Sequence, residues 1–354
     1  MSGDRYKPRG RVGMFDKEYN LRKLKKLCDP LERLAKVIDF EMFREELESN
    51  MLNAERKNNS GCKPYDIVMM LKIIMIKRFY NLSDEQAEFQ INDRASFKEF
   101  LGLSSGDGVP DARTIWLFQD KLIKRGIDEK LFDKFHKYLD SIGILVNLGK
   151  VVDVTIVEVP CQRNRREENE KIKLGEGEEL WKEELCKKRQ KDIEARWTVK
   201  RGKRSFGYKN HIKIDGSSKL IDTYEVTSAE VLDSQGIERL LREEDKGQEI
   251  YADSAYIGQG IEELLKERGI ISQIIERRYR GKQLTEEQKG SNRRKSKIRC
   301  RVEHVFGFVK NSMKGFYIRS IGYQRVKGVI GLTNLVYNIC RYEQIVRLNL
   351  LQAK

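Results

Sequence analysis

The chain has 354 residues, with 70 Lys and Arg against 55 Asp and Glu, a net charge of +15 and a pI of about 9.4. This length suits two domains, and so basic a chain favours nucleic acid or an anionic membrane surface as its partner. No apolar run reaches the roughly 18 residues that a membrane span needs, and the start, MSGDRYKPRGR, lacks the apolar core of a secretion signal. The six cysteines are scattered, as is typical of reduced thiols.

The first part of the chain is predicted to be helical. We expect residues 1–14 to be a basic, disordered N-terminus and residues 15–145 to form an all-α domain. Ser83 and Gln86 have the spacing of a capping box at the start of one helix. The domain either contains a helix-turn-helix, for which residues 65–79, 83–91 and 94–100 are candidates, or serves dimerisation and packing; no base-reading side chain decides between the two. Helical periodicity covers residues 30–48, 65–79, 83–91 and 114–125.

Strands and helices alternate in residues 146–354. A β-branched run, VVDVTIVEV, begins at Val151, and two further strands meet at the turn that starts at Asp215. The highly charged residues at about 161–195 interrupt this pattern and are predicted to be an exposed insertion. The order βββαβαβα predicts an α/β domain with a mixed five-stranded sheet, a ribonuclease-H-like layout. The predicted strands are 151–159, 210–215, 220–226, 249–256 and 270–275; the predicted helices are 231–244, 261–268, 299–310 and 326–350.

Three carboxylates occupy unusual places in this pattern. Asp153 lies inside a strand, where aspartate is disfavoured, and Asp253 lies where a strand hands over to a helix. Glu303 is a lone acid in a basic helix, with Arg299 and Lys310 on the same face. In the predicted layout the first and fourth strands are neighbours, so Asp153 and Asp253 converge and Glu303 approaches from the last helix. Taken singly, Asp253 also suits an N-cap and Glu303 a surface ion pair.

These blocks resemble the DDE transposases of bacterial insertion sequences, and most closely the insertion sequence five group. The resemblance rests on VVDVTIVEVP, RWTVKRGKRSFGYKNHIKID, IYADSAYIG and RCRVEHVFGFVK, and the helical half is similar to the N-terminal domain of the same group. It implies a catalytic triad of Asp153, Asp253 and Glu303, with Arg299 and Lys310 as the family's basic residues. Ser296 stands where the family usually has a tyrosine.

Cutting and rejoining a phosphodiester suits two Mg²⁺ ions held by carboxylates, and Mn²⁺ is expected to substitute. His136, His211 and His304 are too scattered to suggest a zinc site. A basic stretch interleaved with Trp197, Phe206 and Tyr208 predicts DNA contact, and residues 277–297 are expected to be a mobile basic loop. The DNA-binding candidates are Arg196, Lys200, Arg201, Lys203, Arg204, Lys209, Arg293 and Arg294, together with Arg299 and Lys310.

The resemblance implies a transposase that binds the terminal inverted repeats of its element, nicks them and joins the 3′ ends to target DNA. Its partners would be DNA and further copies of the chain, because two ends must be held together, and no nucleotide-binding loop indicates use of ATP. We expect a cytoplasmic, nucleoid-associated bacterial protein. Two alternatives stay open: a host-adopted DNA-binding protein without catalysis, and a stand-alone nuclease of the same fold.

Overall fold

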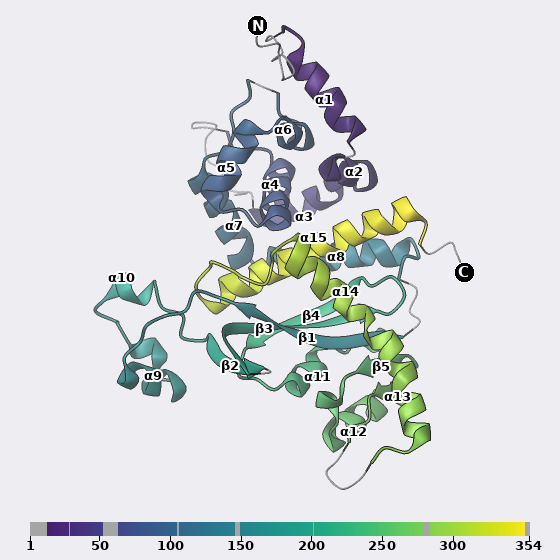
Figure 1. Ribbon diagram of the computed structural model, residues 1–354. Helices are drawn as coiled ribbons and strands as arrows, with labels where there is room; N and C mark the ends of the chain where they lie inside the picture. Colours follow the sequence, from purple (N-terminus) through teal and green to yellow (C-terminus); the bar gives the residue numbers. More distant parts are fainter. Residues whose placement is uncertain are drawn as a thin grey trace, which may run out of the picture.

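The computed structural model describes residues 13–27, 29–51, 63–104, 106–145, 149–200, 202–278 and 283–350. In the described part of the chain eight α-helices precede the first strand; most of them gather at one end of the molecule, and the last, α8, lies next to the sheet (Figure 1). The predicted residues 1–12 of the basic N-terminus lie outside the described residues. The helices are α1 (Asp16–Lys26), α2 (Pro30–Val37), α3 (Arg44–Met51), α4 (Ile67–Tyr80), α5 (Asp84–Asp93), α6 (Ala95–Leu101), α7 (Ala112–Lys124) and α8 (Ile127–Ser141), with the 3₁₀ turn η1 (Phe40–Phe43).

Local sequence signals explain where several of these helices begin. The Ser83 hydroxyl accepts from the Gln86 N–H while the Gln86 side chain accepts from the Ser83 N–H, which confirms the predicted capping box. Asp66 caps α4 through the N–H of Met69. Helix α4 is apolar on nearly every side and forms the centre of the helical part. The predicted helix 30–48 is divided in two by η1, which Asp39 caps.

The sheet has six strands among the described residues, one more than the five predicted. The additional strand, β2, forms a hairpin with a longer β3 than the sequence pattern indicated. The hairpin turns at Gly202, whose φ of +78° glycine adopts without strain. This hairpin was not predicted from the sequence, because residues 196–209 were interpreted as a basic DNA-binding stretch and not as strands. The strands are β1 (Lys150–Glu158), β2 (Arg196–Lys200), β3 (Lys203–Asp215), β4 (Ile221–Ser228), β5 (Glu249–Ala252) and β6 (Ile271–Ile274).

The strand order is β2-β3-β1-β5-β6, with β4 also paired to β3. Strand β1 is central: it runs antiparallel to β3 and parallel to β5, and β5 runs parallel to β6. Gly207 lies where β1 and β3 approach closely; a Cβ there would lie 2.1 Å from the Val157 carbonyl oxygen. The predicted three-strand meander and the predicted adjacency of the first and fourth strands are confirmed.

The helices that follow the sheet differ from prediction in two places. The expected helix 231–244 is instead divided into the short turns η3 (Asp233–Gly236), α11 (Ile237–Leu240) and η4 (Glu243–Asp245). The chain packs tightly onto β3 here: a Cβ atom added at Gly236 would lie 2.5 Å from His211 Nδ1. The expected mobile loop 277–297 is largely helix, because Thr285 and Gln288 form a second capping box. The remaining helices are α12 (Gln259–Glu267), α13 (Glu286–Arg299), α14 (Arg301–Gly307), a π-helical turn (Phe308–Ser312) and α15 (Tyr323–Leu348).

Helix α15 joins the two parts of the molecule. It lies between the N-terminal helices and the sheet (Figure 1), and one apolar core includes residues of both. Gly328 permits close packing, because a Cβ there would lie 2.5 Å from the Ile123 side chain. A second, smaller core lies on the other face of β1 and β5 around Val152, Ile250 and Leu265. None of the helices in the described ranges is both long and apolar enough to cross a membrane.

The charged insertion forms a small unit that projects from the sheet (Figure 1). It contains α9 (Arg166–Lys173), η2 (Gly177–Glu179) and α10 (Leu185–Lys188). Trp181 is its buried centre: the indole N–H donates to Glu168 at 2.9 Å, and Lys187 pairs with the same carboxylate at 3.0 Å. The insertion thus folds around one aromatic side chain.

Candidate active site

Asp153 and Asp253 are brought together by the register of two neighbouring strands. Lys150 pairs with Ile250 and Val151 with Tyr251, so the same register two residues further on places Asp153 beside Asp253. Parallel strands lie about 4.8 Å apart, which allows two carboxylates at the end of β5 to meet one ligand. The prediction that these two strands are adjacent is therefore confirmed.

The Asp153 carboxylate is buried in the middle of β1. One oxygen accepts from the N–H of Val154 at 2.8 Å, and the other accepts from Arg299 Nη1 at 2.9 Å. Burial raises the pKa of Asp153 to about 6, against the opposing effects of the Val154 N–H and Arg299, and the negative charge of Asp253 raises it further. The two carboxylates are thus close enough to repel each other, and the site favours a cation.

Asp253 also caps a turn. Its Oδ1 accepts from the N–H of Ala255 at 2.7 Å, at the start of the 3₁₀ turn η5 (Ser254–Tyr256). The N-cap role that the sequence left open is therefore present. This cap uses only Oδ1 of Asp253 and holds the side chain directly after the end of β5.

Glu303 lies on α14, one helical turn after Arg299. Val302 and Val305 of this helix are buried in the core, and Glu303 lies on the outer side, with 62% of its side chain exposed. Glu303 Oε1 is 3.8 Å from Arg299 Nη2, so the Arg299 guanidinium contacts both Asp153 and Glu303. The Nε of Arg299 is buried without a hydrogen-bond partner among the described residues.

The oxygen donors have the chemistry of a divalent cation site. Carboxylates are the ligands that hard cations such as Mg²⁺ prefer, and the repulsion between Asp153 and Asp253 requires a positive charge. Across the described ranges, however, no three His, Cys, Asp or Glu side chains are arranged to hold a metal ion. The Arg299 guanidinium instead supplies the positive charge beside Asp153.

The predicted single helix 299–310 is a composite of three segments. Arg299 ends α13, Glu303 lies in α14, and Lys310 lies in the π-helical turn that follows. Widened turns of this kind recur at functional sites because they redirect side chains. Lys310 is exposed at this turn.

The β2–β3 hairpin separates its basic residues into exposed and buried ones. Lys203 and Arg204 are exposed at its tip, next to the exposed Trp197, and half of the Lys200 side chain is exposed. Arg201 lies outside the described residues. This exposed tip has the cations and the aromatic face that contact with nucleic acid requires.

Two predicted DNA-binding residues of this stretch are directed into the protein, which corrects the sequence interpretation. Lys209 is buried and its Nζ pairs with Asp233 Oδ1 at 2.8 Å. Arg196 donates to the carbonyl of Ile193 at 2.5 Å and pairs with Glu230 at 3.3 Å. Lys209 lies in the part of β3 where every residue is buried, and Arg196 on β2 turns back toward a carbonyl just before its strand, so charge in the sequence did not reveal either environment.

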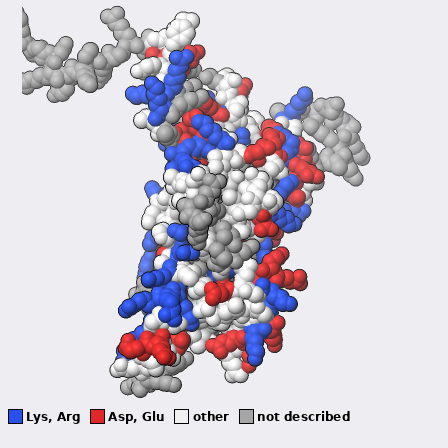
Figure 2. Space-filling view, turned by 90° about the vertical axis from the view of Figure 1, so that its right-hand side faces the viewer, with Lys and Arg blue, Asp and Glu red and all other residues white. Residues whose placement is uncertain are grey.

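Arg293 and Arg294 are exposed on α13. On the face shown in Figure 2, Lys and Arg side chains are dense at the height of α13, with an acidic cluster below, where this helix begins with Glu286 and Glu287. The basic side chains of α13 therefore lead toward Arg299 and the carboxylates.

Two residues near the site, Tyr256 and Asp233, were not selected from the sequence. Tyr256 is buried, and its hydroxyl has no hydrogen-bond partner in the described part of the chain. Burial raises the pKa of Tyr256, and the negative charges of Asp153, Asp233 and Asp253 raise it further. Asp233, held by Lys209, thus belongs to the surroundings of the two catalytic candidates. The only sequence signal was the position of Tyr256, three residues after Asp253.

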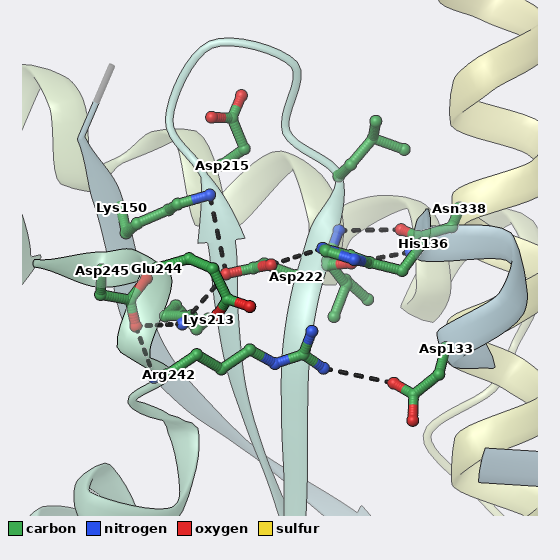
Figure 3. Close-up of polar contacts among 12 residues, drawn as sticks. Asp133, His136, Lys150, Lys213, Asp215, Asp222, Arg242, Glu244, Asp245 and Asn338 are labelled. Carbon is green, nitrogen blue, oxygen red and sulfur yellow. Dashed lines mark hydrogen bonds and ion pairs between the residues drawn. The ribbon is translucent and has the colours of Figure 1, made fainter. Parts of the chain in front are cut away.

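Asp222 belongs to a different group of residues. It lies between Lys213, Lys150 and His136, in a buried polar network that joins α8 to the sheet (Figure 3). Through Lys150 it contributes to the support of β1.

Two aspartates on neighbouring parallel strands of a mixed sheet, with a third carboxylate and cations on the helical segments that follow, are typical of metal-dependent enzymes that act on phosphodiesters. The family described as "Transposase DDE domain" matches residues 148–339, more than half of the chain, and "Transposase domain (DUF772)" matches residues 19–121. The chain therefore belongs to the transposase DDE domain family and is a DDE-type transposase. This combination of domains is typical of bacterial insertion sequence transposases.

A solved structure with some likeness is the cryo-EM structure of the piggyBac transposase synaptic complex with hairpin DNA. It is 11% identical, covers 91% of this chain and 76% of that chain, and has a TM-score of 0.43. A likeness this low carries no argument about the fold or the function of this chain.

Proposed function

We propose that this transposase binds the terminal inverted repeats of its own insertion sequence, cleaves DNA at the element's ends and joins the 3′ ends to target DNA. The observation that carries the proposal is the register that places Asp153 beside Asp253, with Glu303 approaching from α14. We also propose that the chain belongs to the insertion sequence five group, on the resemblance of VVDVTIVEVP, IYADSAYIG and RCRVEHVFGFVK to that group. We further propose a ribonuclease-H-like fold for the catalytic domain, which the position of β1 between antiparallel β3 and parallel β5 supports.

The proposed roles follow from where each residue lies. Asp153, Asp253 and Glu303 would hold two Mg²⁺ ions, for which Mn²⁺ substitutes. When bound, such ions activate the attacking oxygen and stabilise the leaving oxygen of the phosphodiester. Exposed cations hold the DNA backbone near the cut, and they contribute position and not proton transfer. These cations are Lys200, Lys203, Arg204, Arg293, Arg294 and Lys310, with Arg299 once it is released from Asp153.

The division of labour along the chain is also a proposal. Residues 15–145 would bind the DNA ends or mediate dimerisation, and residues 146–354 would carry catalysis. Because transposition holds two ends together, we propose a homodimer or larger synaptic complex as the active form.

The products of the reaction test this function. Purified full-length protein is incubated with a DNA fragment that carries the element's flanking ends and with a supercoiled target, in Mg²⁺ or Mn²⁺. We expect metal-dependent products in which end and target are covalently joined. Cleaved ends without joined strands would instead identify a nuclease, and end binding without cleavage would identify a DNA-binding protein that has lost catalysis.

A second test concerns Arg299. Because its guanidinium donates to Asp153 at 2.9 Å, it competes with a metal ion for this carboxylate. We expect Arg299→Gln to bind Mn²⁺ in the absence of DNA about tenfold more tightly than the wild type, since a charge-assisted hydrogen bond of roughly 1.5–3 kcal/mol no longer competes.

The measurement is a titration of free Mn²⁺ by electron paramagnetic resonance. Lys297→Gln removes an exposed charge from the same helix and is the matched control, which should bind as the wild type does. Equal affinities in all three proteins would show that Arg299 does not compete for the site.

A further inference from the structure

A cavity of about 320 Å³ lies away from the three carboxylates, where the N-terminal helices meet the second part of the chain. Its walls come from α4, the start of α5, α7, the segment 317–321, the beginning of α15 and the end of the insertion. Its lining has five cations, Lys77, Arg78, Arg189, Arg319 and Arg325, and two acids, Asp84 and Asp120. The cavity is therefore strongly basic.

Both acids of this lining are already neutralised. Asp84 pairs with Lys77, which also donates to Gln119 at 3.0 Å. Asp120 pairs with Lys124 at 2.7 Å and with Arg325 at 2.8 Å. Asp84 also attracts Arg78, so its single negative charge is shared between Lys77 and Arg78.

Arg78, Arg189 and Arg319 make no side-chain hydrogen bond or ion pair with any other described residue. The Nε of Arg78 is buried without a partner, and burial lowers the pKa of Arg78 to about 10. The negative charge of Asp84 raises the pKa of Arg78, whereas the positive charge of Arg319 lowers it, so the two guanidiniums repel each other. Arg319 and Arg189 are exposed at the rim. Unpaired arginine forks around one hollow are suited to a phosphate group, whose oxygens accept two parallel hydrogen bonds.

The position of the cavity relates it to the active site. The N–H of Ile318 donates to the carbonyl of Glu158 at 2.9 Å, so the segment with Arg319 adjoins the end of β1. Glu158 is five residues from Asp153, which is roughly 17 Å along a strand.

We propose that this cavity binds a phosphate of the DNA backbone through Arg78 and Arg319, with Arg189 at its rim. The proposal rests on the proposed function for the identity of the ligand. The charge imbalance itself does not depend on that function.

The experiment measures how DNA affinity depends on salt. The affinity of the full-length protein for a fluorescein-labelled duplex from the element's end is measured by anisotropy, from about 50 to 200 mM salt. Arg319→Gln and Arg78→Gln should each weaken binding on the order of tenfold and reduce the slope of log affinity against log salt by about 0.9, the effect of one lost phosphate contact. Arg166→Gln, which removes an equal charge from an exposed ion pair on α9, is the matched control and should change neither quantity.

Thermal unfolding in inorganic phosphate, at constant ionic strength, separates DNA from a small anion and also reports that the variants fold. Phosphate should raise the melting temperature of the wild type more than that of Arg78→Gln. If Arg78→Gln and Arg319→Gln bind DNA with the same affinity and salt slope as Arg166→Gln, the proposal is overturned. Stabilisation of the wild type by phosphate would then show that the cavity binds a free anion and not DNA. An equal loss in Arg166→Gln would overturn it as well. The salt slope is measured without cleavage, so a failure of the proposed transposition reaction is recorded separately.

Discussion

Asp153→Asn should abolish cleavage and joining while DNA binding persists. Asp153 is the buried member of the proposed triad, beside Asp253 and in contact with Arg299. The amide has one less negative charge and cannot balance the cation that the site requires. A loss of about 4 kcal/mol of transition-state stabilisation corresponds to a rate reduction of roughly 10³-fold.

The rate of strand joining under single-turnover conditions is the decisive measurement, with anisotropy as the record of DNA binding. Glu158→Gln is the matched control, because Glu158 lies in the same strand and is held by Ser205 at 2.8 Å and Lys203 at 3.0 Å. We expect this control to join strands at nearly the wild-type rate. An Asp153→Asn protein that joins strands as fast as this control would remove Asp153 from the active site.

The sequence was sufficient to predict the strands that position the candidate site. Asp153 in a β-branched run and Asp253 at a strand end are local signals, and the alternation of strands and helices implied that β1 and β5 are neighbours. Periodicity in the helices found α4, α5, α7 and α15, with the Ser83 capping box marking one start. These features depend on short stretches of chain, which single-sequence patterns describe well.

Features that depend on tertiary contacts were not predictable. The Asp153–Arg299 ion pair joins residues 146 positions apart, and no local pattern shows that Arg299 is directed at a carboxylate. Lys209 and Arg196 were interpreted by charge, whereas Lys209 on β3 pairs with Asp233 and Arg196 on β2 pairs with Glu230. Residues 231–244 form short turns and no continuous helix because Asp245 pairs with the buried Lys213.

Asp222 should be the largest single contributor to stability among the polar residues of the network in Figure 3. Its oxygens lie 2.5 Å from His136 Nε2, 3.0 Å from Lys213 Nζ and 3.6 Å from Lys150 Nζ, and Lys213 is completely buried. Asp222→Asn leaves two buried lysines short of negative charge. We expect it to lower the free energy of unfolding by about 3–5 kcal/mol.

Asp133→Asn is the matched control for this change. Asp133 pairs with Arg242 at 3.3 Å on the edge of the same network, but 54% of its side chain is exposed. Loss of an exposed pair costs about 0–1 kcal/mol. Urea unfolding of the two variants and the wild type at neutral pH measures the difference, and equal losses in both variants would contradict a special role for Asp222.

The pH dependence gives an independent check on the same residue. Burial alone would raise the pKa of Asp222, but the hydrogen bond with His136 and the charges of Lys213 and Lys150 lower it far below its usual range. A lowered folded-state pKa means that the stabilisation is fully present above the unfolded pKa of about 3.9 and is lost as the pH falls toward the folded value. The stability gap between wild type and Asp222→Asn should therefore be constant at neutral pH and narrow below about pH 4. A gap that instead widened in acid would show that the Asp222 carboxylate is not held ionised, and β1, which Lys150 begins, would then need another support.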